Sequence, residues 1–203
     1  MALRGEAFRN DDIEWNFGLT AAFLDNELVE LGTDNQGNPI PPISLAAGRQ
    51  RHVEGYELGG YWQAPIASYE DANGDGLLQP NEVVVGVQLE DGTFDTDSTA
   101  FIGSAFPKRE ISFNTDLTLF NLVRLSALFD HKGDYYLVNQ TKALRCVSYF
   151  VCDEAYNGSL EDQAAAVAFF EHGTYAGYIE RADFVKLREL ALTFMIPRSW
   201  TSM

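Results

Sequence analysis

One segment of the chain alternates strictly between apolar and polar side chains, and this pattern constrains the fold more than any other feature. Over residues 13–23, one set of side chains is apolar: Ile13, Trp15, Phe17, Leu19, Ala21 and Phe23. The side chains between them are Glu14, Asn16, Gly18, Thr20 and Ala22. Alternation with a period of two predicts a long β-strand with one apolar face and one more polar face.

The same pattern returns later in the chain and predicts an all-β fold. The expected strands lie at about 13–24, 111–120, 123–131 and 184–196. Only residues 120–122 connect the second strand to the third, which predicts a tight antiparallel hairpin. In the last segment, the apolar positions change from odd to even numbers near Arg188 and Glu189. This change predicts a β-bulge, because one extra residue moves every later side chain to the opposite face.

Two long connections, at about 25–110 and 132–183, separate the expected strands. The second contains a predicted short helix, which Ser159 opens as its N-cap residue and an alanine-rich run continues. Connections of this length are uncommon in a compact soluble domain but ordinary in the extracellular loops of outer-membrane barrels.

The length of the strands fits the same class of protein. About 9–11 tilted residues cross the hydrocarbon of a bilayer. We therefore expect residues 1–203 to form part of a transmembrane antiparallel β-barrel, with about four long strands and two large extracellular loops. Four strands cannot close a barrel, because the smallest barrels have about eight. A soluble antiparallel sandwich shows the same alternation, so the pattern leaves both interpretations open.

Charge and composition exclude some functions. The 14 Lys and Arg residues against 30 Asp and Glu residues give a net charge of −16, which opposes general nucleic-acid binding. The first twelve residues lack the apolar segment of an export signal, so the chain is expected to be either cytoplasmic or a piece of something longer. Cys146 and Cys152 form either a local disulfide or two free thiols.

The strongest local motif is a twelve-residue calcium loop between Asp71 and Glu82. Its sequence matches the EF-hand pattern D-x-[DN]-x-[DN]-G-x₅-E. The expected calcium ligands are Asp71, Asn73, Asp75, Leu77 (through its carbonyl), Gln79 and Glu82. Gly76 lies at the position where the loop turns sharply. Extended rather than helical segments flank the loop, so we expect structural calcium in place of a calcium sensor; a metal-free turn is the other interpretation.

Several ordered motifs together carry a resemblance to a known family. They are the calcium loop, Phe106-Pro107, the stretch 125–130 with Gly133 and Tyr135, the stretch 139–141, and the closing stretch 178–194. In this order they resemble the carboxy-terminal part of a SusC/RagA-type TonB-dependent transporter of the bacterial outer membrane. The chain contains no counterpart of that family's amino-terminal plug, so the resemblance implies a barrel fragment of a longer protein.

The resemblance also implies a function and partners. Transporters of this family import oligosaccharides or peptides through a 22-stranded barrel in the cell outer membrane. A SusD-like surface lipoprotein captures the substrate, and the TonB complex drives import through the amino-terminal part. Outer-membrane lipid would then surround the apolar faces of the strands.

Two other functional classes compete with transport. An enzyme is disfavoured, because His52, His131 and His172 are scattered and no G-x-S-x-G motif is present. The stronger alternative is a secreted soluble β-sandwich that acts as a binding module stabilised by calcium. The two remaining interpretations differ in what covers the apolar face of the strands, which is lipid in a transporter and a second sheet in a sandwich.

Overall fold

A computed structural model describes residues 1–45, 49–147 and 152–196, and the chain divides into two compact units. The sheet unit comprises Met1–Asp25, Pro107–Asp134 and Asp183–Met203. The mixed unit comprises Asn26–Phe106 and Tyr135–Ala182. No helix in the described part of the chain is long and apolar enough to cross a membrane.

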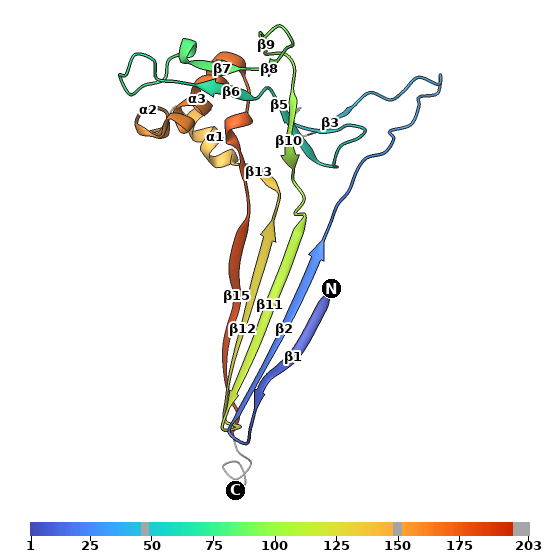
Figure 1. Cartoon of the computed structure of the whole chain (residues 1–203), viewed down its shortest axis with the longest axis vertical. Helices are drawn as coiled ribbons and strands as arrows, with labels where there is room; N and C mark the ends of the chain where they lie inside the picture. The colour runs from blue at the N-terminus through green and yellow to red at the C-terminus, as the bar shows by residue number, and fades with distance from the viewer. Residues whose placement is uncertain (46–48, 148–151, 197–203) are drawn as a thin grey trace. The chain divides into compact units, whose positions relative to one another are not determined.

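The sheet unit is one five-stranded antiparallel sheet (Figure 1). Its strands, in spatial order, are β1 (Ala2–Arg9), β2 (Ile13–Phe23), β11 (Arg109–Leu119), β12 (Val123–Gly133) and β15 (Phe184–Phe194). The last four agree with the strands that alternation predicts. β1 was not expected, because Gly5 interrupts its apolar side and a register shift between Glu6 and Phe8 breaks its alternation.

Two short turns join strands at the same end of this sheet (Figure 1). Between β1 and β2, the side-chain oxygen of Asn10 accepts hydrogen bonds from the backbone of Asp12 at 2.9 Å and of Ile13 at 2.6 Å. Between β11 and β12, Phe120 and Asn121 both have positive φ angles, of 52° and 51°. Two consecutive positive φ angles are the mark of a type I′ turn, whose twist matches that of the strands, so the predicted tight hairpin is present.

The predicted bulge is also present. Leu128 of β12 lies opposite Glu189, whereas Phe129 lies opposite Leu187, so Arg188 is the extra residue on β15. The insertion lets Leu187 and Leu190 share one face although their numbers differ in parity.

The mixed unit contains short strands and helices. Its four-stranded sheet has the order β10 (Ala100–Ser104), β5 (Gly60–Gln63), β4 (Gln50–His52) and β3 (Ile43–Leu45). Its two-stranded sheets are β6 (Ile66–Tyr69) with β7 (Val83–Val85), β8 (Val87–Gln88) with β9 (Phe94–Asp95), and β13 (Tyr136–Val138) with β14 (Ile179–Arg181). The helices are α1 (Gln140–Val147), α2 (Glu154–Asn157) and α3 (Leu160–His172), with 3₁₀ turns η2 (Pro80–Glu82) and η3 (Ala176–Tyr178). The chain as a whole is therefore mostly β, with few helices.

The predicted helix is α3. The Ser159 hydroxyl accepts a hydrogen bond from the backbone of Asp162 at 3.2 Å, which caps the first turn. The helix ends at Gly173, whose φ of 67° is the left-handed conformation common after a last turn. α1 and α2 were not expected.

The alanines of α3 bring the two long connections together. Ala164 and Ala168 pack against Leu78, Val83 and Val85 of the first connection. On the other side of the helix, small residues allow a close approach of η3, since a Cβ on Gly177 would lie 2.4 Å from that of Ala165. The regions predicted as two loops thus share a core and fold as one unit.

Candidate functional site

The predicted calcium loop follows β6 and ends with η2, and two carboxylates at its ends organise it. Asp71 accepts hydrogen bonds from the backbone of Gly74 at 2.8 Å and of Gly76 at 2.9 Å. Glu82 is buried, and its carboxylate accepts from the backbone of Ala72 at 3.0 Å and of Gln79 at 2.9 Å. Both carboxylates therefore turn inward over the loop backbone.

The middle of the loop continues this pattern. The side chain of Asn73 accepts from the backbone of Asp75 at 2.8 Å, and Asp75 accepts from the backbone of Leu77 at 2.8 Å. Gly74 and Gly76 have φ angles of 74° and 84°, which only glycine adopts readily. The sequence of the loop thus dictates its tight local winding.

The side chains of this loop carry hard oxygen atoms, which are the ligands that calcium prefers. The carboxylates of the loop, however, do not lie together as a preformed metal site. Among the described residues, the one group of three acidic, histidine or cysteine side chains with all ligand atoms within 4.8 Å is Cys146, Cys152 and Glu154. In this structure the carboxylates of the loop are engaged by backbone amides. Calcium binding stays a prediction.

A glutamine of α3 anchors the loop, and no sequence pattern pointed to it. Gln163 is 3% exposed. Its side-chain oxygen accepts from the backbone of Leu78 at 2.8 Å, and its amide donates to the carbonyl of Gly76 at 3.1 Å and of Gly158 at 3.2 Å. A buried amide with three partners fixes position strongly, because leaving any of them unpaired is costly.

The second candidate site is the five-stranded sheet, whose two faces differ in chemistry. The pairing registers of the strands place a set of apolar residues on one face of the sheet. The set includes Leu3, Trp15, Leu19, Phe113, Leu117, Leu125, Phe129, Leu190 and Leu192. Many of these side chains are exposed, with Leu190 at 65% and Leu192 at 58%. Exposed apolar surface that extends over several strands marks a surface made to contact lipid or protein.

The polar residues on this apolar face have hydrogen-bond partners. The indole nitrogen of Trp15 donates to the hydroxyl of Thr115 at 2.8 Å. His131 lies 2.9 Å from the carbonyl oxygen of Phe184. Internal pairing of this kind is what a lipid environment requires, because lipid offers no hydrogen bonds.

The opposite face of the sheet carries paired polar and charged groups. Ser126 donates to Asp116 at 2.6 Å, and Arg188 lies 2.8 Å from Asp130. A hollow of about 660 Å³ also touches this sheet, lined by Arg4, Gly5, Asn16, Phe17 and Asn114. The sheet therefore separates an apolar surface from a polar surface that water can wet.

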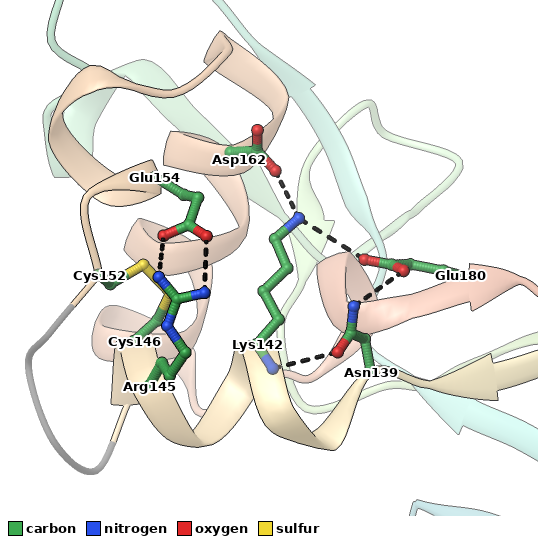
Figure 2. The surroundings of a disulfide bond; sticks show 8 residues. All are labelled: Asn139, Lys142, Arg145, Cys146, Cys152, Glu154, Asp162 and Glu180. Atoms are coloured by element: carbon green, nitrogen blue, oxygen red, sulfur yellow. Dashed lines mark hydrogen bonds and ion pairs between the residues drawn. A yellow bond between two sulfur atoms is a disulfide. The ribbon is translucent and has the colours of Figure 1, made fainter.

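The mixed unit holds a third cluster, around a disulfide between Cys146 and Cys152 (Figure 2). Of the two interpretations of these cysteines, the structure shows the disulfide. Beside it, the ammonium group of Lys142 donates a hydrogen bond to the Asp162 carboxylate at 2.5 Å and lies 3.5 Å from the Glu180 carboxylate. Burial opposes the charge on Lys142, but the two carboxylates outweigh it and raise its pKa. The same contact with Lys142 lowers the pKa of Asp162.

Tyr178 lies in the apolar part of this cluster. The side chain is 1% exposed, and its hydroxyl makes no hydrogen bond within the described residues. Burial, reinforced by the charges of Asp162 and Glu154, raises the pKa of Tyr178 to about 12. The phenol is therefore a neutral core group throughout the physiological pH range.

Comparison with known proteins decides the fold. The chain resembles part of a solved transporter. It matches the structure described as "Structure of the RagAB peptide transporter" with a TM-score of 0.66 and 14% sequence identity. The match covers 98% of this chain and 22% of the transporter chain. No protein-family profile and no curated protein matches the sequence.

This similarity shows the fold, since identity is only 14%. It agrees with the family resemblance drawn from the sequence motifs at the level of architecture. The chain spans 22% of the transporter chain, so the activity of the whole transporter does not transfer with the fold.

Proposed function

We propose that this chain forms part of the wall and outer loops of an outer-membrane TonB-dependent transporter of the SusC/RagA type. The observation that carries the proposal is the two-faced sheet, which belongs to a fold that matches the RagAB structure over 98% of this chain and 22% of the transporter chain. Its role is passive. It separates lipid from a polar passage, with no catalytic chemistry of its own.

The proposal assigns an environment to each face of the sheet. Apolar side chains such as Leu190 and Phe129 contact outer-membrane lipid, and the face with Asp116 and Asp130 lines the passage. Strands β1 and β15 lie at the edges of the sheet, and in a closed barrel they pair with further strands.

The substrate and the partners follow from the same proposal. A matched structure is described as a peptide transporter, which favours peptides over oligosaccharides as cargo. A SusD-like lipoprotein delivers the cargo from outside, and the TonB complex acts through a plug domain. Binding to nucleic acid plays no part, given the net charge of −16.

Lipid contact is testable with Trp15, which is 45% exposed on the apolar face. A variant that carries Trp62→Phe and Trp200→Phe leaves Trp15 as the one tryptophan in the chain. In vesicles that contain brominated lipid, we expect its fluorescence to be quenched relative to ordinary vesicles. Equal fluorescence in both, together with a monodisperse chain in plain buffer, would support the soluble binding module instead.

We also propose that the Asp71–Glu82 loop binds calcium as a structural ion. Asp71, Asn73, Asp75, Gln79 and Glu82 would supply side-chain oxygens, and Leu77 would supply its carbonyl. The ion would offset the repulsion between the carboxylates that its binding would gather. Trypsin does not cut inside this loop, so the test uses a protease that cleaves at leucine; calcium should slow cleavage at residues 77–78.

The matched control is Asp75→Asn with Glu82→Gln, which removes two charges without changing shape much. We expect calcium to protect the natural chain and not the double variant. Equal cleavage rates of the natural chain with calcium and with chelator would refute calcium binding and leave the loop as a metal-free turn.

A further inference from the structure

The disulfide lies inside the core of the mixed unit. Cys146 lies in the last turn of α1, one residue before the helix ends at Val147, and Cys152 lies two residues before α2 begins. The two residues are 3% and 5% exposed. They pack with Ala143, Ala165 and Tyr178 in one apolar cluster.

Polar contacts hold the same segments in place independently of the sulfur atoms. The two terminal guanidinium nitrogens of Arg145 contact the Glu154 carboxylate, at 3.1 and 3.2 Å, so this ion pair joins α1 to α2 beside the disulfide (Figure 2). Lys142 ties α1 to Asp162 of α3. Once these contacts form, the helices enclose the disulfide.

We propose that the Cys146–Cys152 bond is a modification introduced by thiol–disulfide exchange with an external donor disulfide, before α1, α2 and α3 complete their packing. In the first step, the thiolate of one cysteine attacks the donor disulfide, and one donor sulfur leaves as a thiolate. In the second, the other cysteine's thiolate attacks the mixed disulfide and releases the second donor sulfur. The cysteine pair loses two electrons and two protons, and the donor is reduced to a dithiol.

The order of events follows from burial. Exchange needs an exposed thiolate that a donor sulfur can approach in line. In the packed unit the two cysteines are 3% and 5% exposed, and the Glu154 carboxylate lies within 4.8 Å of the sulfurs. Burial and this negative charge both disfavour a thiolate, and burial restricts the approach of a donor. Oxidation must then come first, which requires the unfolded or partly folded unit to meet an oxidising compartment such as the periplasm.

The test compares disulfide closure in the folded and the unfolded chain. The whole chain is reduced, returned to detergent micelles, and exposed to oxidised glutathione; alkylation and mass spectrometry follow closure over time. We expect closure at least about tenfold slower in the folded chain than in concentrated guanidinium. If the reduced mixed unit does not pack until it is oxidised, the order is supported as well.

A single-thiol control separates burial from closure. In Cys152→Ser, the remaining Cys146 should be alkylated at least about tenfold more slowly when folded than in guanidinium. Equal rates for the folded and unfolded forms in either experiment would overturn the proposal. So would exported protein that carries two free thiols. Neither result bears on the transporter proposal, which rests on the sheet unit.

Discussion

Leu190→Arg tests the proposal that the apolar face of the sheet contacts lipid. Leu190 is near the middle of β15, opposite Ala127, and is 65% exposed. An arginine on the lipid side of a barrel costs about 2–4 kcal/mol near the bilayer midplane. Since about 1.4 kcal/mol is a factor of ten, the equilibrium constant for folding in vesicles should fall roughly 30- to 700-fold.

Leu128→Arg is the matched control. Leu128 lies one position along β12 from Ala127, on the opposite face, and directly across from Glu189. Arginine there gains an opposite-charge pair of about 0.2–1 kcal/mol in place of a lipid penalty. The two variants, Leu190→Arg and Leu128→Arg, introduce the same residue at nearly the same depth in the membrane, so they differ mainly in the face of the sheet that carries the arginine.

The assay is urea unfolding of the whole chain in phospholipid vesicles, followed by tryptophan fluorescence. We expect Leu190→Arg to shift the midpoint strongly to lower urea and Leu128→Arg to leave it within error or raise it. A soluble sheet with Leu190 already exposed to water would change by no more than about 0.5 kcal/mol. Equal effects of the two variants would refute the assignment of lipid to the apolar face.

Three further predictions concern packing and charge. Ser159→Ala removes the cap of α3 and should lower the stability of the mixed unit by about 1 kcal/mol in thermal unfolding, whereas Ser159→Asp should not. Lys142 lowers the pKa of Asp162, so their contact stabilises the fold at pH values above the ordinary pKa of the carboxyl group. This stabilisation is lost as the pH falls through the lowered pKa. The melting temperatures of the natural chain and of Lys142→Met should therefore converge when the pH is brought below about 4. Deletion of Arg188 removes the bulge and preserves alternation, whereas deletion of Leu187 removes the bulge but brings Arg188 to the apolar face opposite Phe129; in vesicles, the β circular dichroism of the second variant should be lost at lower urea than that of the first.

The long strands could be predicted because alternation is a local property of the sequence. β2, β11, β12 and β15 each show it over most of their length, and even the bulge at Arg188 left a trace as a change of phase. β1 lacked the signal because of Gly5 and its own register shift. Its place in the sheet comes from pairing with β2, a contact between strands that no local pattern records.

The mixed unit was harder to predict, because its contacts join distant parts of the chain. The winding of the Asp71–Glu82 loop followed from its motif. Its anchor did not, since Gln163 binds Leu78 across 85 residues. α1 and α2 are short helices that owe their positions to the disulfide and to the Arg145–Glu154 pair rather than to helix propensity. Sequence patterns could therefore predict the existence of the long connections but not their common core.

The bulge in β15 explains how a charged segment can lie at the edge of an apolar face. Arg188 and Glu189 are consecutive, so strict alternation would direct one of them to the apolar side. The extra residue avoids this, because Arg188 reaches Asp130 on the polar face while Glu189 stays opposite Leu128. Within the five described strands, Arg109 at the start of β11 is then the one charged residue whose register places it on the apolar side, and it pairs with Asp134 at 2.7 Å.

Such strict exclusion of charge fits the proposed contact of that face with lipid. A water-exposed sheet tolerates lysine or glutamate among its apolar residues, and edge strands often use them to prevent aggregation. Here the edge strand β15 presents Leu190, Leu192 and Phe194 at 65%, 58% and 68% exposure, and its charges are kept to the other side. An edge of this kind would aggregate in water, whereas in a bilayer each of these side chains is in its preferred solvent.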